Sequence, residues 1–291
     1  MSKFASARLV SAFVASACVA AALAWPASAP AQSAAATAQA QKVPDFSGLF
    51  TRQARNGIPA PSTFEMPTDP ALRPGPLMNT TKGDDAGLIW VADHNDPILL
   101  PWNAEYLKKR GEQELIEVNT VAWNICWPPG VPQVLVMREP LQFLQEPKMI
   151  TMLYQRDHTV RRVYLNEKLP EKITPSWFGR SVGRYEGNAL IIETAGVTAK
   201  TGVDRFNTQH TDQLRTEERY ELVDEGQFLR VIVKVTDPGA FTKPWYAQAH
   251  YRRQAQNVGI EEIVCAENNR DITREGGLGE FPIPKDDTPD F

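Results

Sequence analysis

Short runs of alternating hydrophobic and polar positions fill the second half of the chain. From residue 133 onward the side chains switch between apolar and polar, and turn-forming residues separate the runs. A period of two residues is typical of half-buried β-strands. The strands predicted in this way span 134–138, 141–145, 149–156, 159–165, 180–186, 189–195, 214–223, 228–237, 245–253 and 260–265.

Turn residues indicate that successive strands form antiparallel hairpins. Glycine and asparagine at 187–188 suit a two-residue turn, which pairs Tyr185 with Leu190. The loop at 224–227 connects two further strands in the same way. An up-and-down meander of this length avoids open edges by closing on itself. We therefore predict a mainly β protein whose antiparallel strands form a lipocalin-like barrel, with a β-sandwich as the alternative.

The first half of the chain lacks this alternation. Residues 43–132 are rich in proline, asparagine, aspartate and glycine, which predicts an irregular wrap. One short helix is expected within it, at 102–116, where two leucines stand among charged residues. The wrap and the meander at 133–269 are interpreted as a single β-rich domain, 43–269. The remaining residues, 270–291, are predicted to form a loose tail.

The N-terminal residues are typical of a secretion signal. Residues 1–29 combine a positive start, an uncharged apolar run at 9–23 and a small-residue cleavage site at 27–29. A membrane anchor is the alternative, but the apolar run is shorter than the roughly 20 residues that span a bilayer. Residues 30–42 are expected to be a flexible leader. The mature protein is therefore expected in the periplasm of a Gram-negative bacterium or outside the cell, without a membrane span.

Removal of the signal leaves two cysteines in the mature chain, Cys126 and Cys265. Two cysteines in an oxidising compartment usually form a disulfide, and closing so long a loop contributes on the order of 4 kcal/mol. A nucleophilic Cys126 is the alternative, although no histidine lies near it in sequence. We favour the disulfide.

Charge and motif content argue against several classes of function. The net charge of -4 argues against nucleic acid, whose phosphates demand a basic surface. The chain has no phosphate-binding glycine loop, no G-x-S-x-G elbow and no H-E-x-x-H motif. Its histidines lack the spacing of metal ligands. We therefore expect neither a cofactor nor a metal, and a small molecule as the partner.

The hairpin predicted at 214–237 carries the candidate chemistry. Its register follows from the loop length and from the hydrophobic pattern, which together place Glu218 opposite Val233 on the inward face. Burial among valines raises the pKa of a carboxyl group, which suits a general acid or base near neutral pH. Alternatively, Glu218 is paired with an inward arginine and only stabilises the barrel. The candidate partners are Arg161, Arg162, Arg180 and Arg184.

Other residues are expected near the same end of the hairpin. Asp237 shares the inward face, and His210 lies just before the first strand. The candidate catalytic residues are therefore His210, Glu218 and Asp237. The aromatic residues expected to bind the substrate are Trp177, Tyr220 and Trp245. The outward row of the first strand is expected to be a solvated, charge-paired face; it comprises Arg215, Glu217, Arg219 and Glu221.

Several short segments together have a distinctive form. They are Pro-Asp-Phe-Ser-Gly at 44–48, Cys-Trp-Pro-Pro-Gly-Val-Pro at 126–132, Gly-Arg-Ser-Val-Gly-Arg-Tyr-Glu-Gly-Asn-Ala-Leu at 179–190, the spacing of His210, Leu214, Glu218 and Arg219, and Cys-Ala-Glu-Asn at 265–268. The chain resembles a family of exported, mostly uncharacterised bacterial proteins in these segments. It departs from that pattern at Tyr185, where tryptophan is usual. The resemblance implies one domain and a secreted setting, and it implies no particular activity.

Two hypotheses for the function follow. The first is a periplasmic, cofactor-independent enzyme of the lyase, hydratase or isomerase type, which uses acid/base chemistry on a small apolar, aromatic molecule inside the barrel. The second is a non-catalytic periplasmic carrier of a hydrophobic ligand, in which Glu218 is a structural ion-pair partner. A concave cavity shared by the three candidate catalytic residues favours the enzyme. A Glu218 sealed against an arginine favours the other interpretation.

Overall fold

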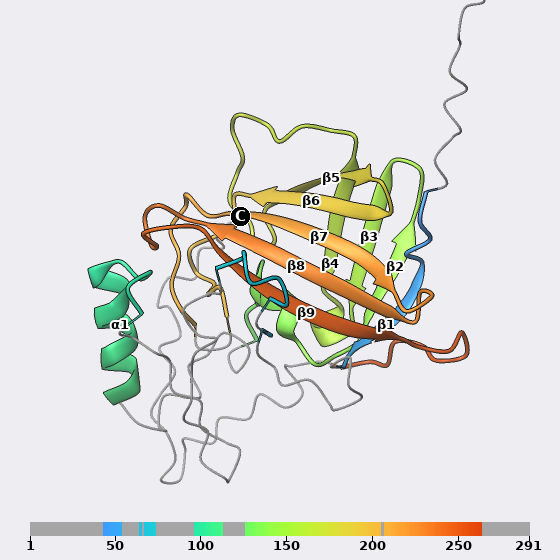
Figure 1. Ribbon diagram of the computed structural model, residues 1–291, viewed down its shortest axis with the longest axis horizontal. Coiled ribbons are helices and arrows are strands. Elements are labelled where there is room, and N and C mark those ends of the chain that lie inside the picture. The colour runs from blue at the N-terminus through green and yellow to red at the C-terminus, as the bar shows by residue number, and fades with distance from the viewer. Residues whose placement is uncertain are drawn as a thin grey trace, which may run out of the picture. The chain divides into compact units, whose positions relative to one another are not determined.

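The computed structural model describes residues 43–53, 64–65, 67–73, 96–112, 126–204 and 207–263 (Figure 1). All of them belong to one compact unit, Gln41–Phe291. The predicted signal peptide, leader and C-terminal tail lie outside the described residues. The same holds for Cys265, so its pairing with Cys126 stays a prediction.

Nine strands close into a barrel in the order in which they occur along the chain (Figure 1). This confirms the mainly β fold and the barrel, and it excludes the sandwich. The strands are β1 (Gly48–Arg52), β2 (Leu141–Gln145), β3 (Met149–Tyr154), β4 (Val160–Leu165), β5 (Arg180–Glu186), β6 (Ala189–Ala195), β7 (Arg215–Val223), β8 (Phe228–Thr236) and β9 (Trp245–Arg253). The helical elements are α1 (Pro101–Glu112) and the short 3-10 turns η4 (Gln133–Val136) and η5 (Arg156–His158).

One pair of neighbouring strands is parallel. A closed ring whose neighbours are all antiparallel needs an even number of strands, and this barrel has nine. The parallel pair is β4 and β5, in which Val163 lies opposite Ser181 and Leu165 opposite Gly183. Parallel neighbours need a crossover connection of about a dozen residues or more, and residues 166–179 supply it. The expected meander is therefore wrong at this one step.

The predicted hairpin registers are confirmed. Tyr185 lies opposite Leu190 across the turn at 187–188. Glu218 lies opposite Val233 in the β7–β8 hairpin. Turn length and hydrophobic alternation select the same register in both cases, because a slip of one residue would turn every apolar side chain outward.

Some element boundaries differ from the sequence prediction. The run predicted as a strand at 134–138 overlaps η4, whose residues are all buried; a short apolar run has the same pattern whether it is a buried strand or a buried helical turn. In the predicted strand 260–265, the described residues have no regular structure. Helix α1 begins one residue earlier than predicted, and the predicted end at 113–116 lies outside the described residues.

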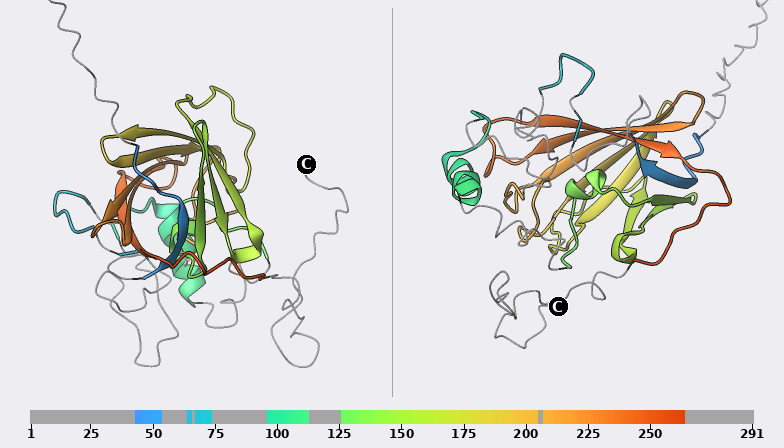
Figure 2. Two further views of the ribbon diagram at one scale, coloured as in Figure 1. Left: turned by 90° about the vertical axis from the view of Figure 1, so that its right-hand side faces the viewer. Right: turned by 90° about the horizontal axis from the view of Figure 1, so that it is seen from below.

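Strand β1 falls within the segment predicted to be an irregular wrap. It pairs with β2 through Gly48 and Phe143, and with β9 through Phe50 and Arg253. Figure 2 shows β1 completing the ring between those two strands. Because β1 is only five residues long, it offers little alternation from which it could be recognised.

The segment at Glu65 continues the sheet along the free part of the β9 edge. Its backbone N–H donates to the carbonyl of Gln248 at 2.8 Å. Its carboxylate lies 2.7 Å from Nδ1 of His250 and accepts a hydrogen bond of 3.3 Å from Arg52. Burial alone would raise the pKa of Glu65, but the hydrogen bond with His250 and the charge of Arg52 together lower it. The ionised carboxylate of Glu65 therefore connects the N-terminal segment to the barrel.

Aromatic side chains fill the barrel interior beside β1, β2 and β7. Phe143 packs edge-on against Phe50 and Tyr220, with ring centroids 5.6 and 5.8 Å apart. Tyr154 and Tyr251 are also buried, and the Tyr251 hydroxyl donates to the carbonyl of Leu135. Large rings thus occupy the space between these strands.

Among the described residues, α1 is too short and too polar to be a bilayer-crossing segment, and none of the other helical elements meets that requirement.

Candidate functional site

Glu218 forms an ion pair with Arg161 inside the barrel. Two parallel hydrogen bonds of 2.7 and 2.8 Å join the guanidinium to the two carboxylate oxygens. The Arg161 side chain is 1% exposed and the Glu218 side chain is 0% exposed. Arg161 reaches this position because β4 alternates, so that its side chain shares the inward face with Val163. Of the four arginines considered from sequence, Arg161 is therefore the partner.

Hydroxyl groups complete the hydrogen bonding of this pair. The carboxylate of Glu218 also accepts bonds from Thr216 at 3.2 Å and from Tyr220 at 2.7 Å. Arg161 donates further bonds to Ser181 at 3.1 Å and to Thr194 at 2.7 Å. Burial first, and then the charge of Glu218, raise the pKa of Tyr220, so this phenol stays protonated and donates. Glu218 thus accepts four hydrogen bonds.

This network changes what Glu218 can do chemically. A general base needs a lone pair that can reach a ligand's proton. Both oxygens of Glu218 are already bonded to a buried cation and to hydroxyl groups. The geometry therefore favours the structural ion pair over proton transfer.

His210 is held in one tautomer by its neighbours. Its Nδ1 lies 2.8 Å from the carbonyl oxygen of Thr211, which can only accept, so Nδ1 carries the proton. Its Nε2 lies 2.9 Å from the hydroxyl of Thr201, which donates to it when the ring is neutral. Burial lowers the pKa of His210, in spite of the Thr211 carbonyl and the charge of Asp237. Both ring nitrogens of His210 therefore already have hydrogen-bond partners within the protein.

Asp237 organises the connection that follows β8. Its carboxylate accepts hydrogen bonds from the backbone N–H and the hydroxyl of Thr211, at 2.6 and 2.7 Å. It also accepts one from the backbone N–H of Gly239 at 2.9 Å. Helix α1 packs beside this connection, where Trp102 donates to the Gly239 carbonyl (Figure 1). The three backbone and hydroxyl contacts match an aspartate that shapes a loop.

The three predicted substrate-binding aromatics make separate contacts. Tyr220 belongs to the interior network. Trp245 is buried against Phe241, with ring centroids 5.7 Å apart. Trp177 is partly exposed and lies against Trp127, with centroids 5.5 Å apart.

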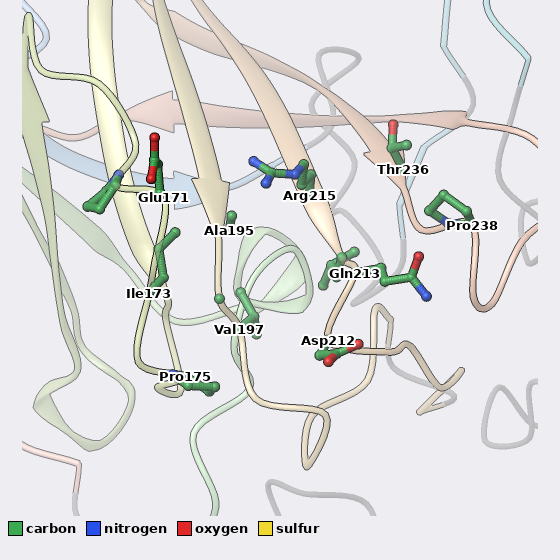
Figure 3. Close-up of a pocket in the computed structure, with 13 residues that line it drawn as sticks. Glu171, Ile173, Pro175, Ala195, Val197, Asp212, Gln213, Arg215, Thr236 and Pro238 are labelled. Atoms are coloured by element: carbon green, nitrogen blue, oxygen red, sulfur yellow. The ribbon is translucent and has the colours of Figure 1, made fainter.

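A pocket of about 540 Å³ lies at the ends of three neighbouring strands (Figure 3). The register places Ala195 of β6 opposite Arg215 of β7, and Arg215 opposite Thr236 of β8. Their neighbours Thr194 and Thr216 contact the interior network, so these three residues face outward. The pocket therefore lies on the outer face of the barrel. None of the six residues predicted to be catalytic or substrate-binding lines it, although Asp237 lies between two that do.

The opposite wall of the pocket comes from the β4–β5 crossover. Ser176 forms a parallel bridge with Val197, through hydrogen bonds of 3.0 and 2.9 Å to the backbone on either side of that residue. Gly196 has a φ of 73°, and a Cβ there would lie 2.4 Å from Cγ2 of Ile173. Only glycine lets the crossover approach this closely. The pocket is lined by Pro170, Glu171, Ile173, Pro175, Ala195, Gly196, Val197, Asp212, Gln213, Leu214, Arg215, Thr236 and Pro238.

Metal ligation has no evident site in the part of the chain that the structure describes. No group of three or more histidine, cysteine, aspartate or glutamate side chains there is arranged to hold an ion.

Sequence reasoning missed the pocket for two reasons. The sequence pattern places Arg215 in a solvated, charge-paired row, and such pairing holds for Arg219 and Glu221, whose side chains are 2.8 Å apart. The crossover residues such as Glu171 lie in a segment without periodicity. A usable signal is that Arg215 is the first charged residue of its row, at the strand end, and stands beside the small residue Ala195.

Comparison with known proteins yields little. No family model matches the chain, and no curated protein matches it. Among solved structures, the chain is similar to a REP1-NXSQ fatty acid transporter, with 15% identity, 40% of this chain and 71% of that chain covered, and a TM-score of 0.25. A point mutant of that transporter gives 14% identity, coverage of 40% and 72%, and the same TM-score. Similarity at this level carries no argument about function.

Proposed function

We propose that this protein binds a small molecule without transforming it, and that the ligand occupies the pocket on the outer face of the barrel. The observation that carries the proposal is the state of Glu218. Its four hydrogen bonds to buried groups leave the inward face of β7 without an available acid or base. Polar side chains face an open space at the pocket on the outer face instead.

The pocket has the dimensions and composition of a small-molecule site. Such sites commonly measure roughly 300–1,000 Å³ and combine apolar walls with a few polar groups. Here Ile173, Val197 and Leu214 supply apolar surface, and Gln213 and Arg215 supply hydrogen-bond donors. This lining supports a ligand with both an apolar and a polar part.

The proposal differs from a carrier with its ligand inside the barrel. Aromatic rings and the Arg161–Glu218 pair occupy the interior beside β1, β2, β4 and β7. We further propose that binding takes place in the periplasm, after removal of residues 1–29. The apolar run and the small-residue cleavage site in that segment support export.

Ligand recovery from the protein tests the proposal. The full chain is exported by a Gram-negative host, purified and weighed by native mass spectrometry, and bound molecules are then extracted and identified. Ala195→Leu fills the pocket from the β6 wall and is expected to lose the ligand. The matched control is Val160→Leu, because Val160 is exposed on β4 and does not line the pocket.

Two results would contradict the proposal. If Ala195→Leu retains the ligand at the stoichiometry of the control, the ligand lies elsewhere. If the purified protein converts the recovered molecule in amounts that exceed its own concentration, it is an enzyme.

A further inference from the structure

Arg215 is the arginine of the outer face that lines the pocket. Its neighbours across the strands are Ala195 and Thr236, which carry no charge. No carboxylate among the described residues lies within ion-pair distance of it. An exposed cation without an ion-pair partner, at the edge of a pocket, is available to a ligand.

Three arginines of this face, on β5, β7 and β8, are paired. Arg184 contacts Glu186 and Glu193. Arg219 and Arg230 both contact Glu221. Arg162 and Arg252, which are exposed on β4 and β9, also have no ion pair among the described residues, but they do not line the pocket.

Two carboxylates also line the pocket. Glu171 comes from the crossover, and Asp212 comes from the turn before β7. In Figure 3, the guanidinium of Arg215 extends toward the side of Glu171, and Asp212 lies at the other side of the opening. Neither carboxylate has an ion-pair partner within the part of the chain that the structure describes. The pocket therefore presents two negative groups and one positive group.

Apolar residues also line the pocket. They include Ile173, Val197 and Leu214, of which Val197 and Leu214 are buried. A ligand that lies on this surface displaces water from the charged groups as well. Burying a charge without a partner is costly, so a purely apolar ligand would lose binding energy at all three groups.

We propose that the ligand of this pocket is a small zwitterion with an apolar body, such as a free apolar amino acid or a short apolar peptide. This inference rests on the proposed binding function. The ligand carboxylate pairs with Arg215, and the ligand ammonium pairs with Glu171 or Asp212. Hydrogen bonds between charged groups are roughly twice as strong as those between neutral ones.

Ligands with a single charge fit less well. An apolar anion satisfies Arg215 but is repelled by the two carboxylates. An apolar cation satisfies a carboxylate and leaves Arg215 without a partner. Only a ligand with both charges gives each kind of group an opposite charge.

A panel of related probes tests this ligand class. The methyl resonances of Val197 and Leu214 in the full chain report binding in the pocket by NMR. The zwitterions are L-leucine and leucyl-leucine, and the difference between them separates an amino acid from a peptide. N-acetyl-leucine lacks the cation, leucinamide lacks the carboxylate, and octanoate is an apolar anion. The zwitterions are expected to shift the methyl resonances at concentrations at which the other three do not.

Charge-neutralising variants assign the contacts. Arg215→Gln is expected to raise the Kd for the zwitterion by about tenfold or more, because a charge-assisted hydrogen bond is lost. Asp212→Asn and Glu171→Gln test the ammonium side, with a loss expected in at least one of them. The controls are Arg252→Gln and Glu217→Gln, two exposed residues that do not line the pocket.

The outcomes separate this inference from the proposed function. If N-acetyl-leucine, leucinamide or octanoate binds at the pocket methyls as tightly as leucine, the zwitterion inference is overturned while the binding function stands. If no probe shifts these methyls, the zwitterion inference is also overturned, and the binding function depends on the extracted ligand alone. If Arg215→Gln binds like the Arg252→Gln control, Arg215 is not the carboxylate partner and the inference fails.

Discussion

Replacing Glu218 by alanine separates a structural role from a catalytic one. The variant leaves Arg161 as a buried cation with only Ser181 and Thr194 to accept its hydrogen bonds. It also removes the acceptor of the Tyr220 hydroxyl. A catalytic carboxylate is expected to cost activity when it is removed, whereas this one is expected to cost folding stability.

The size of the loss follows from the burial of the pair. Removing one partner of a buried ion pair costs about 3–5 kcal/mol, because the other charge stays in an apolar environment. Domains are commonly stable by about 5–15 kcal/mol, so the variant loses a large part of its stability. Replacing Arg161, Glu218 and Tyr220 together by methionine, leucine and phenylalanine is expected to cost much less, because no buried charge is then left without a partner.

Urea denaturation followed by tryptophan fluorescence measures these differences. Formate or acetate is expected to raise the unfolding midpoint of Glu218→Ala, and to leave the unsubstituted protein unchanged, because the small carboxylate can replace the missing one beside Arg161. A loss below about 1 kcal/mol for Glu218→Ala would refute the structural assignment, since breaking a buried pair costs several times more. So would a triple variant that loses as much as the single variant.

Three further predictions concern other parts of the fold. Because the folded pKa of Glu65 lies below its ordinary value of 4.5, its contact with His250 stabilises the fold above that pH; the stabilisation is lost as the pH falls through the folded pKa, and Glu65→Gln is expected to flatten this part of a stability–pH curve. Gly196→Ala is expected to cost about 1–3 kcal/mol in urea denaturation, because the backbone there has a positive φ. Cys126 and Cys265 are expected to be unreactive toward a thiol reagent in the exported, denatured protein, and reduction is expected to lower stability by about 4 kcal/mol.

The β7–β8 hairpin could be predicted from the sequence because two independent constraints agree there. The four-residue loop sets the pairing, and the valines of β8 require the same pairing to reach the core. The ion-pair partner of Glu218 could also be narrowed down from the sequence. The period of two on β4 places Arg161, and not Arg162, on the face of Val163. That step needs β4 to be known as a barrel strand, which the pattern of one strand does not show.

The parallel pair and the pocket could not be predicted in the same way. Alternation along a strand shows which side chains face inward, but it does not show the direction of the neighbouring strand. The crossover at 166–179 contains proline and charged residues without periodicity, so its path depends on tertiary contacts. Ser176, which joins the crossover to the residues just after β6, has no sequence feature that marks it. The sequence therefore predicts a site inside the barrel, where the alternation of apolar and polar residues is clearest.

The parallel pair explains why a pocket lies outside this barrel. Leu165 ends β4 opposite Gly183, and β5 begins at Arg180, so the crossover has to return by only three residues, or about 10 Å. Residues 166–179 are longer than this return requires, and the excess forms the outer wall of the pocket.

Replacing residues 169–174 by a shorter glycine–serine link should therefore keep the barrel and remove the pocket. Glu167 still contacts Arg180, and Ser176 still bridges to Val197. The unfolding free energy is expected to change by no more than about 2 kcal/mol, because the exchange removes mainly exposed residues, while the ligand is lost. The control shortens the exposed hairpin loop at 224–227 to a two-residue turn and keeps the ligand. A link variant that unfolds would show that the crossover belongs to the barrel's core, and one that still binds ligand would place the site elsewhere.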